Sequence, residues 1–319
     1  MQVSFVIPLY NCLPLTQAMV TSLQGSLPTG LTHEIILVDD GSTDGTREWL
    51  ATMERQGAPF RVVLNEKNLG YAGANNRGAA TACGDFLALL NNDLILSSGW
   101  LEPMLAVHHA LSHRAGLIGN IQYNAQTGAV DHAGVFINHR GKPEHLTELP
   151  LFRRWRALDA RRVVDAVTGA CALVRRSLFL ELGGFDEGFA NGGEDVDFCL
   201  RSRAGGSISG VALRSAVRHH ISASPGRKLR DEQNSRRLTL RWRDELARLG
   251  ARASWCRNYL ESEWTSPHDP LDLPAARGAL SYQLWLRREP PPEAYFGMQR
   301  AIARELERWE QLLGPAESQ

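Results

Sequence analysis

Residues 87–96 read Leu-Ala-Leu-Leu-Asn-Asn-Asp-Leu-Ile-Leu, an apolar run that stops at three polar residues and then resumes. Four consecutive apolar residues are typical of a strand buried on both faces, as in a parallel sheet. Ligands of open α/β sheets gather at the carboxyl ends of such strands, where Asp93 would lie. A hard divalent cation takes oxygen ligands and shares its other positions with substrate phosphates. Because Asn-Asn-Asp is also a common strand-ending turn, the stretch predicts either a turn or a cation site.

Three apolar segments precede this stretch, at residues 3–11, 33–38 and 60–64, with helical patterns between them. Strands that alternate with helices indicate parallel β-α-β units with right-handed crossovers. All four polar strand endings then lie along one edge of the sheet. The first hundred residues therefore predict an α/β fold with a ligand site at that edge.

The polar endings differ in how easily a structural role explains them. Thr43 or Asp44 can cap the helix that follows the second strand, whereas Asp39 and Asp40 are harder to explain in this way. Small residues within 70–78 predict either close packing of a helix on the sheet or close approach of backbone to a ligand. Neither G-x-G-x-x-G after the first strand nor a P-loop pattern occurs. Carboxylates and a metal could still hold a nucleotide.

The composition is that of a globular protein of 319 residues, with 43% hydrophobic and 22% charged residues. Lys plus Arg and Asp plus Glu both number 35, so no global charge favours nucleic acid. The five cysteines are scattered without C-x-x-C spacing, which argues against a zinc cluster or a disulfide framework. Neither a basic leader nor an apolar run of about eighteen residues is seen. We expect a cytoplasmic protein, with the inner face of the membrane as an alternative location.

A second block spans residues 167–201. It contains an apolar strand and then a helix whose first turn holds Glu194, Asp195 and Asp197. Acidic residues there suit the helix dipole, but a Glu-Asp pair after glycines also exposes one carboxylate to a cleft. Residues 138–162 predict a surface loop, and residues 208–213 predict a short strand. His132 is equally explained as a structural hydrogen-bonding group or as an acceptor contact.

Segments 4–11, 38–46, 68–78 and 89–93 resemble, in order and spacing, the successive motifs of family 2 glycosyltransferases. The resemblance is closest to the bacterial rhamnosyltransferase-like and O-antigen branch and covers residues 3 to about 228. It implies the GT-A fold, a Rossmann-like α/β mixed sheet flanked by helices. We expect a catalytic domain at 1–228, with a nucleotide-sugar half at 1–98 and an acceptor half at 99–228. A helical extension follows at 229–319.

The resemblance also implies roles for single residues. Asp39 would contact the nucleotide base, and an Asp-x-Asp motif would bind Mn²⁺ or Mg²⁺ at the donor diphosphate. Here the first Asp of that motif is Asn91, which leaves Asp93 as its only charged ligand. A late His-x-x-Ser-x-Ser element at 219–224 adds His219, which fits better than His220. We predict donor binding by Pro8, Tyr10, Asn11, Asp39, Asp40, Ser42, Asn68, Gly70, Asn75, Arg77, Asn91, Asn92, Asp93 and Arg227.

Sugar transfer from a nucleoside diphosphate needs a base for the acceptor hydroxyl and a cation for the leaving diphosphate. The resemblance implies Asp195 as the base, and Glu194 would orient the acceptor. One base opposite the leaving group gives inversion. The hypothesis is an inverting, metal-assisted transferase of hexosyl or deoxyhexosyl groups in bacterial surface polysaccharide or glycoconjugate synthesis. Alternatives are a sugar-phosphate nucleotidyltransferase, whose basic glycine-rich loop is missing after the first strand, and a noncatalytic nucleotide-sugar-binding protein.

The only strong charge asymmetry lies in residues 226–257, which contain ten basic and four acidic residues. This segment could meet a lipid-diphosphate acceptor at a membrane surface or simply solvate a helix. An amphipathic helix at 293–313 is expected to pack on the catalytic domain or on a second subunit, as in a homodimer. The expected partners are a nucleotide-sugar donor and a glycan, lipid-linked or protein acceptor, without nucleic acid.

Overall fold

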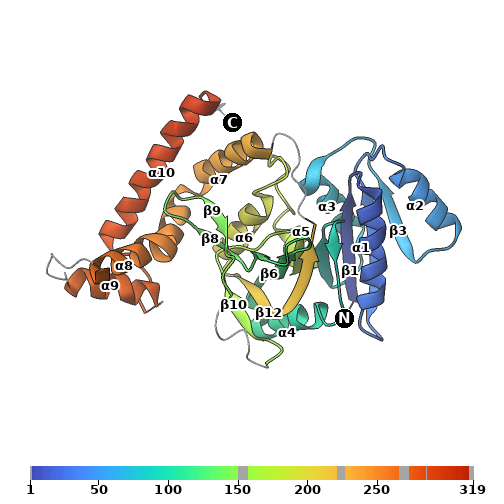
Figure 1. Ribbon diagram of the computed structural model, residues 1–319, viewed down its shortest axis with the longest axis horizontal. Helices are drawn as coiled ribbons and strands as arrows, with labels where there is room; N and C mark the ends of the chain where they lie inside the picture. The colour runs from blue at the N-terminus through green and yellow to red at the C-terminus, as the bar shows by residue number, and fades with distance from the viewer. Residues whose placement is uncertain (1, 150–156, 221–226, 266–272, 285, 316–319) are drawn as a thin grey trace. The chain divides into compact units, whose positions relative to one another are not determined.

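The computed structural model describes residues 2–149, 157–220, 227–265, 273–284 and 286–315 (Figure 1). The chain divides into two compact units. Unit 1 contains Met1–Val135 and His145–Pro225, and unit 2 contains Phe136–Glu144 and Gly226–Gln319. The boundary at residue 228 between a catalytic domain and an extension stays a prediction.

The first half of unit 1 is a parallel sheet. Its strands lie in the order β3-β2-β1-β4, and β1 pairs in parallel with both β2 and β4. The strands are β1 (Gln2–Leu9), β2 (Thr32–Asp39), β3 (Phe60–Leu64) and β4 (Phe86–Leu90), connected by α1 (Leu13–Ser26), α2 (Thr46–Arg55) and α3 (Gly70–Thr81). The predicted parallel β-α-β units are therefore confirmed.

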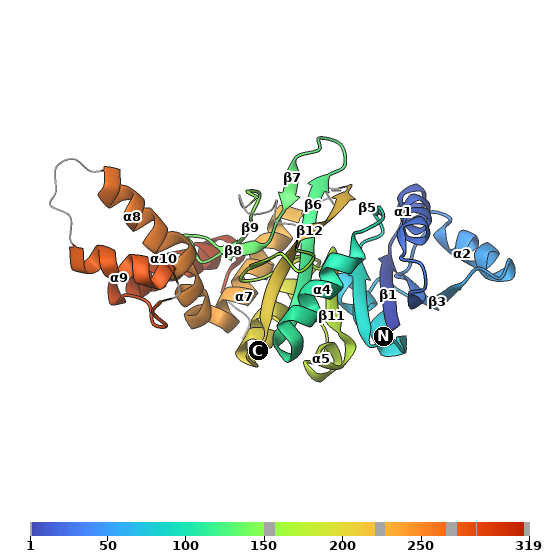
Figure 2. The same ribbon diagram turned by 90° about the horizontal axis from the view of Figure 1, so that it is seen from below.

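The second half makes the sheet mixed, because β11 (Cys171–Arg175) runs antiparallel to both β4 and β6 (Ala115–Asn124). Beyond β6 lie β12 (Ile208–His219) and β10 (Arg161–Val163). Short strands β5 (Leu94–Ile95) and β7 (Val130–His132) pair with β12 and β6. Figure 2 shows β5, β7 and the last residues of β6 together at one end of the sheet.

Two sequence-based expectations about this half were wrong. The short strand expected at 208–213 continues to His219, because a register shift between Ala212 and Ala216 lets β12 stay paired with β6. The surface loop expected at 138–162 contains β9 (Pro143–His145), which pairs with β8 (Val135–Ile137), and also β10. Residues 150–156 of that loop lie outside the described residues.

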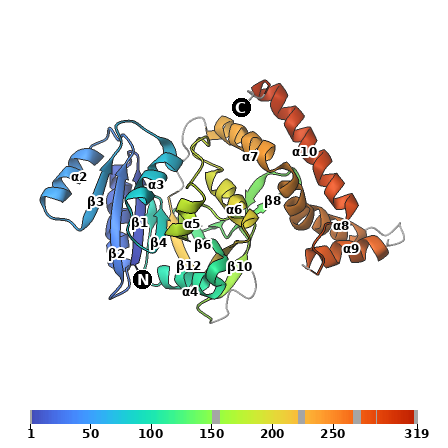
Figure 3. The same ribbon diagram turned by 180° about the vertical axis from the view of Figure 1, so that it is seen from behind.

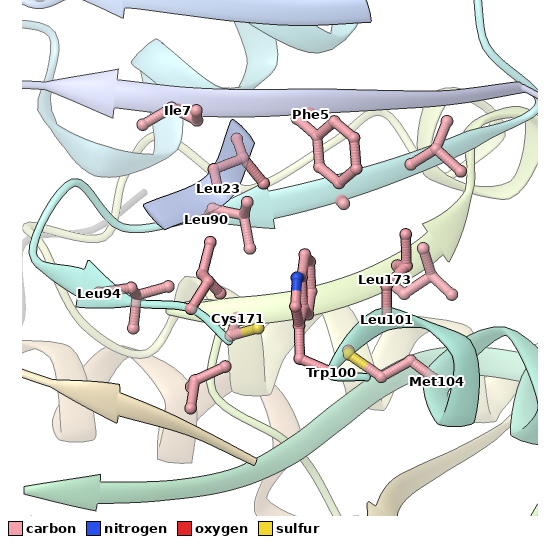
Figure 4. Close-up of a cluster of buried hydrophobic side chains, with 14 of the residues drawn as sticks. Phe5, Ile7, Leu23, Leu90, Leu94, Trp100, Leu101, Met104, Cys171 and Leu173 are labelled. Carbon is pink, nitrogen blue, oxygen red and sulfur yellow. The ribbon is translucent and has the colours of Figure 1, made fainter. Parts of the chain in front are cut away.

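Helices cover both faces of the sheet (Figure 3). One face packs on α1 and α4 (Leu101–Leu111, followed by the short η1, Ser112–Arg114), and its core surrounds the buried Trp100 (Figure 4). The other face carries α3, α5 (Arg176–Glu181) and α6 (Glu194–Ala204). A Cβ on Gly78 would lie 2.4 Å from Val6 Cγ1, so α3 packs closely on this face. The predicted mixed sheet flanked by helices, with further helices at the C-terminus, is confirmed.

Unit 2 is mainly helical. It contains α7 (Arg227–Gly250), the π-helical turn η3 (Ala251–Trp255), α8 (Cys256–Thr265), α9 (Leu273–Gln283) and α10 (Pro292–Leu313). The predicted amphipathic helix is α10, which packs on α7 and η3 of the same unit, an arrangement that the sequence did not predict. Although burial raises the pKa of Glu232, hydrogen bonds from Trp309, Lys142 and Arg308 lower it to about 2.

Several basic residues of 226–257 contribute to this packing. Arg252 lies over the Tyr282 ring at 4.2 Å, and Arg236 donates to the Gly314 carbonyl at 2.8 Å. Membrane contact through this segment, and a homodimer, stay predictions. Within the described ranges, none of the helices combines the length and the apolar character needed to span a bilayer.

Candidate active site

The carboxyl ends of the parallel strands meet at one edge of the sheet. Leu9 at the end of β1 lies opposite Asp39 at the end of β2. The Asp40 N–H donates to the Leu9 carbonyl, and the Asn65 N–H donates to the Asp39 carbonyl, both at 2.8 Å. These bonds bring the loops after β1, β2 and β3 side by side, as an open α/β site requires.

The Asp39 carboxylate is completely buried and paired with Arg47 of α2. Arg47 Nε donates to Asp39 Oδ2 at 2.7 Å, and its guanidinium also donates to the Asn65 carbonyl. The backbone N–H groups of Gly41 and Ser42 approach the same carboxylate at 3.3 Å. Sequence reasoning missed Arg47, whose only signal is a basic residue two positions into the helix after the acidic loop. The contact of Asp39 with a base stays a prediction.

Asp40 shapes the loop that leads into α3. Its Oδ1 accepts from Asn65 Nδ2 and from the Leu69 N–H, both at 2.8 Å, and its Oδ2 accepts from the Gly70 N–H at 2.9 Å. Asn68 Oδ1 also accepts from Gly70 at 2.9 Å. Three hydrogen bonds from the chain thus occupy the Asp40 carboxylate. Asp40 would therefore contribute to nucleotide-sugar binding only by holding this loop in place.

The loop after β1 is held in an uncommon backbone conformation. Asn11 and Cys12 have φ angles of 57° and 60°, in the left-handed region that few non-glycine residues adopt. Asn11 Oδ1 accepts from the Thr43 N–H at 2.8 Å, and the Asn11 N–H donates to Ser42 Oγ at 2.9 Å. Next to this joined pair of loops, the Tyr10 side chain is half exposed, while Pro8 lies within β1.

Asp44, one of two candidate helix caps, accepts from the N–H and hydroxyl of Thr46 at 3.2 and 2.6 Å. It also accepts from the Leu13 N–H at the start of α1, at 2.9 Å. Although burial raises the pKa of Asp44, the hydrogen bonds from Thr46 and Leu13 outweigh it and lower that pKa. The N-cap residue of α2 is Gly45, without a side-chain cap bond, so the predicted cap by Thr43 or Asp44 is wrong. Asp44 instead bonds to the first residues of α1 and α2.

The three polar residues after β4 meet the end of β12. Asp93 is buried, and its Oδ1 lies 3.1 Å from His219 Nε2. Asn91 Nδ2 lies 3.5 Å from the same nitrogen. Pairing of β5 with β12 produces this meeting, because His219 lies opposite Leu94. His220 contacts this loop through its backbone, because its N–H donates to the Asp93 carbonyl at 3.0 Å.

Asn91, Asp93 and His219 suit a divalent cation. The buried atoms Asn91 Oδ1 and Asp93 Oδ1 have no hydrogen-bond partner in the described chain, and Asp93 Oδ1 lies beside His219 Nε2, itself a possible metal ligand. Two ligands about 2.1 Å from a metal and at right angles are about 3.0 Å apart, close to the Asp93–His219 separation. No cluster of three His, Cys, Asp or Glu occurs among the described residues. Two such ligands suffice where waters and substrate phosphates complete the shell.

Asn92 is used differently from its neighbours. Its Nδ2 donates to Thr16 Oγ1 of α1 at 2.9 Å and approaches the Asn11 carbonyl at 3.4 Å. It therefore ties the loop after β4 to the loop after β1, which keeps the two groups of predicted donor-binding residues together.

The acidic start of α6 lies at the same edge. The Asn91 N–H donates to the Ala170 carbonyl at 2.8 Å, and the Gly169 N–H donates to Asp195 Oδ2 at 2.8 Å. Asp195 Oδ1 accepts from the Val196 N–H at 2.8 Å. Two hydrogen bonds and the adjacent residues 169 and 170 thus connect the Asp195 carboxylate to the backbone of the Asn91–Asp93 loop.

Two of the three carboxyl groups at this helix start, those of Glu194 and Asp195, have raised pKa values. Burial raises the pKa of Glu194, and the adjacent Asp195 charge raises it further. Burial also raises the pKa of Asp195, against the opposing effects of the Gly169 and Val196 N–H groups. Glu194 Oε2 accepts from the Gly192 N–H at 2.7 Å. Asp197 instead accepts from Arg201 Nε at 2.7 Å and has a structural role.

Tyr71, which the sequence analysis did not select, connects the two halves. Its hydroxyl donates to the Gly169 carbonyl at 2.8 Å, and its N–H donates to Asn191 Oδ1 at 2.8 Å. Burial raises the pKa of Tyr71, and the charges of Glu194 and Asp195 raise it further. A tyrosine among small residues is the only signal in the sequence.

His132 is a buried hydrogen-bonding group, one of its two predicted roles. Its Nε2 faces the Thr168 N–H at 3.4 Å, and its ring lies 4.9 Å from that of His145. Burial lowers the pKa of His132, as do the charges of His145 and His219. His132 is therefore neutral near pH 7 and supports the segment that holds Asp195.

The other predicted donor-binding residues are Asn75 and Arg77 of α3 and Arg227 of α7. Asn75 is buried and donates to the Tyr71 carbonyl at 2.9 Å, which leaves its Oδ1 without a partner. Arg77 is exposed on α3. Arg227 is the first residue of α7, and its side chain lies outside the described part of the chain, as do Ser222 and Ser224 of the late His-x-x-Ser-x-Ser element.

Comparison with curated proteins identifies bacterial relatives. The chain is 32% identical over 73% of its length to the uncharacterized protein y4gI of Sinorhizobium fredii. It is 33% identical over 70% of its length to the O-antigen biosynthesis protein RfbC of Myxococcus xanthus. It spans only 26% and 18% of these two proteins. An N-acetylglucosaminyl-diphospho-decaprenol L-rhamnosyltransferase of Mycobacterium tuberculosis is 29% identical over 63% of this chain and 71% of its own length.

Solved structures share the fold. GalNAc-T7, crystallised with UDP, GalNAc and Mn²⁺, matches 99% of this chain and 58% of its own with a TM-score of 0.64 at 17% identity. Residues 1–349 of S. aureus TarS match 98% of this chain and 92% of their own with a TM-score of 0.54 at 15% identity. The predicted GT-A fold is confirmed. The model of "Glycosyl transferase family 2" matches residues 4–183, more than half of the sequence. The chain therefore belongs to glycosyl transferase family 2.

Proposed function

We propose that this chain transfers a hexosyl or deoxyhexosyl group from a nucleoside diphosphate sugar to an acceptor hydroxyl, with metal assistance and inversion. Its family membership and its similarity to an O-antigen biosynthesis protein support a role in bacterial surface polysaccharide or glycoconjugate synthesis. The rhamnosyltransferase relative supports a lipid diphosphate-linked sugar as one class of acceptor.

The observation that carries the proposal is the short hydrogen-bonded path between the Asn91–Asp93 loop and Asp195. Asn91 bonds to Ala170, and the adjacent Gly169 bonds to Asp195. One end of this path holds atoms that suit a cation, and the other holds a carboxylate with a raised pKa. A donor diphosphate and an acceptor hydroxyl could therefore meet at one sheet edge.

The donor side would be formed by the loops after β1, β2, β3 and β4. Asp93 and His219, with Asn91, would hold Mn²⁺ or Mg²⁺, which when bound would neutralise charge on the leaving diphosphate. The buried Asp39 and its partner Arg47 would define the base pocket. Asp40 would act by holding the loop that contains Asn68 and Gly70.

Asp195 would be the general base. A carboxylate with a raised pKa binds a proton more tightly, which suits removal of a proton from an alcohol. As the acceptor O–H bond breaks, its proton passes to Asp195, and its oxygen forms a bond to the anomeric carbon. The bond from that carbon to the diphosphate breaks, so the configuration inverts. The Gly169 N–H would orient Asp195, and Glu194 would face the acceptor.

The test is turnover of a panel of nucleotide sugars by the purified chain, with Mn²⁺, with Mg²⁺ and with a chelator. Release of nucleoside diphosphate with at least one donor, dependent on metal and lost in Asp195→Asn, is expected. Asp195→Asn should still bind that donor, seen as a rise in melting temperature. A nucleotidyltransferase would instead release pyrophosphate from a nucleoside triphosphate and a sugar phosphate. A noncatalytic binding protein would be stabilised by a donor without consuming it.

A further inference from the structure

Unit 2 has an apolar stripe that the proposed transferase chemistry does not use. Leu273, Leu280 and Leu284 are 67, 48 and 57% exposed, and Leu286 just beyond is 78% exposed. Spacings of seven and four residues place the first three on one side of α9 and of the turn directly after it, since α9 ends at Gln283. We call these four leucines the α9 stripe, and Figure 1 shows the backbone of α9. Single exposed leucines are ordinary, but several exposed leucines close together in one segment favour an interaction surface.

The opposite side of α9 is anchored within unit 2. Ala279 and Tyr282 are buried. The Tyr282 hydroxyl donates to the Arg248 carbonyl at 3.0 Å, and Arg252 Nε donates to the Tyr282 carbonyl at 3.1 Å. These contacts fix the rotation of α9 about its own axis. The leucines of the stripe are therefore exposed because the opposite side of α9 packs within unit 2.

Backbone hydrogen bonds hold the end of the stripe as well. The Leu284 N–H donates to the Leu280 carbonyl at 2.9 Å. The N–H groups of Leu286 and Arg287 donate to the Ser281 carbonyl at 2.9 and 3.2 Å. The segment after α9 thus turns back on the helix and presents its leucine and arginine from a fixed backbone.

The charged residues within 273–288 are all positive, and the acidic residue Glu289 follows them directly. Arg277, Arg287 and Arg288 are exposed, and residues 273–288 include no Asp or Glu. Arginine beside exposed leucines suits a surface that is apolar inside and anionic outside, because the guanidinium reaches lipid phosphates while leucine enters the acyl boundary.

We propose that the α9 stripe with Arg277, Arg287 and Arg288 binds the surface of an anionic lipid bilayer. A second copy of the chain fits less well, since a twofold contact through this stripe brings arginines toward their own copies. This surface lies outside residues 226–257, where Arg236 and Arg252 already serve packing within unit 2.

The experiment measures co-sedimentation of the full chain with vesicles, without donor or acceptor. Vesicles of phosphatidylcholine alone are compared with vesicles that also contain phosphatidylglycerol. Binding only to the anionic vesicles is expected. Leu284→Ser with Leu286→Ser should weaken it about tenfold or more, because less apolar surface is buried. Arg287→Glu with Arg288→Glu should weaken it about twentyfold or more, since each cation adds attraction to the anionic surface.

Two exposed residues of the same unit serve as matched controls. Leu312→Ser removes a leucine that is 52% exposed on α10, and Arg243→Glu reverses a charge that is exposed on α7. Both should bind as the parent chain does. Equal weakening by Arg243→Glu would assign binding to overall charge and overturn the proposal. Failure to bind anionic vesicles, or a concentration-dependent dimer lost in the double leucine variant, would overturn it too. Sugar transfer is not read in this experiment, so its outcome leaves the proposed function untouched.

Discussion

The carboxylates after β2 and those at the start of α6 are of the same chemical kind, but the chain uses them differently. Asp39 is paired with Arg47, and Asp40 accepts three hydrogen bonds from the loop before α3. Among the described residues, neither Glu194 nor Asp195 forms an ion pair with Lys or Arg, and both have raised pKa values. Fully partnered carboxylates build loops, whereas incompletely neutralised ones keep the capacity to take a proton.

The strongest test of this contrast is Asp195→Asn. An amide cannot accept the acceptor proton, so kcat should fall by about 10²- to 10⁴-fold. Donor affinity should change little, because the predicted donor contacts lie on other loops. Steady-state kinetics with donor titration measure both quantities. A variant that retains activity within a fewfold would show that the base is another group.

The second test compares two neighbouring histidines on the cation side. His219→Ala should raise the Mn²⁺ concentration needed for half-maximal turnover by at least about tenfold, since even indirect supports of metal ligands change affinity this much. His220→Ala is the matched control, because its contact with the Asp93 loop is a backbone N–H that alanine keeps. The reverse result would exchange the two histidines and remove His219 from the proposed site.

The third test addresses the partnered carboxylates. In Asp40→Asn the side-chain NH₂ would face either the Gly70 N–H or the Leu69 and Asn65 donors, leaving buried donors unpaired. Local opening should become easier by about 1–3 kcal/mol. Hydrogen exchange at the Leu69 and Gly70 amides measures this directly. Asp159→Asn, whose side chain is about half exposed, is the control and should leave those amides unchanged. Unchanged protection in Asp40→Asn would mean that Asp40 does not hold the loop.

Local sequence pattern was enough to predict the strand ends and the acidic groups beside them. The run at 87–90 is β4, and Asp93 follows it, because a buried apolar strand must give way to polar residues where the sheet ends. The helix that begins at Glu194 was equally visible, since glycines precede an acidic first turn. In both places the signal lies within about ten residues.

The features that local pattern could not explain all depend on pairings distant in sequence. His219 was selected from the family resemblance, but it lies beside Asp93 because β12 continues past a register shift and meets β5, which no pattern near 208–213 indicates. Arg47 reaches Asp39 only once α2 has packed beside β3. Tyr71 bonds to Gly169, 98 positions later, so its place between the two halves could not be read from its neighbours.

The smallest expected effect, and the most discriminating, concerns the pH profile. If Asp195 must be ionised to act, kcat/KM should rise with pH through a pKa above that of an ordinary aspartate, because burial raises it. Burial and the adjacent Asp195 charge raise the pKa of Glu194 to about 8, so Glu194 is still protonated where Asp195 ionises, and Glu194→Gln should leave the acidic limb almost unchanged.

His145→Ala should move the limb to higher pH, because the positive charge of His145 lowers the pKa of Asp195. A raised pKa also makes the free energy of unfolding depend on pH. A carboxyl whose folded pKa is raised contributes its stability below the unfolded pKa and loses it as pH rises through the folded value. Glu194→Gln should therefore reduce the fall in stability toward higher pH, seen in denaturant midpoints across the same range. If His145→Ala left the limb unchanged or moved it to lower pH, the titrating group would not be a carboxylate beside this histidine, and the contrast with Asp39 and Asp40 would lose its basis.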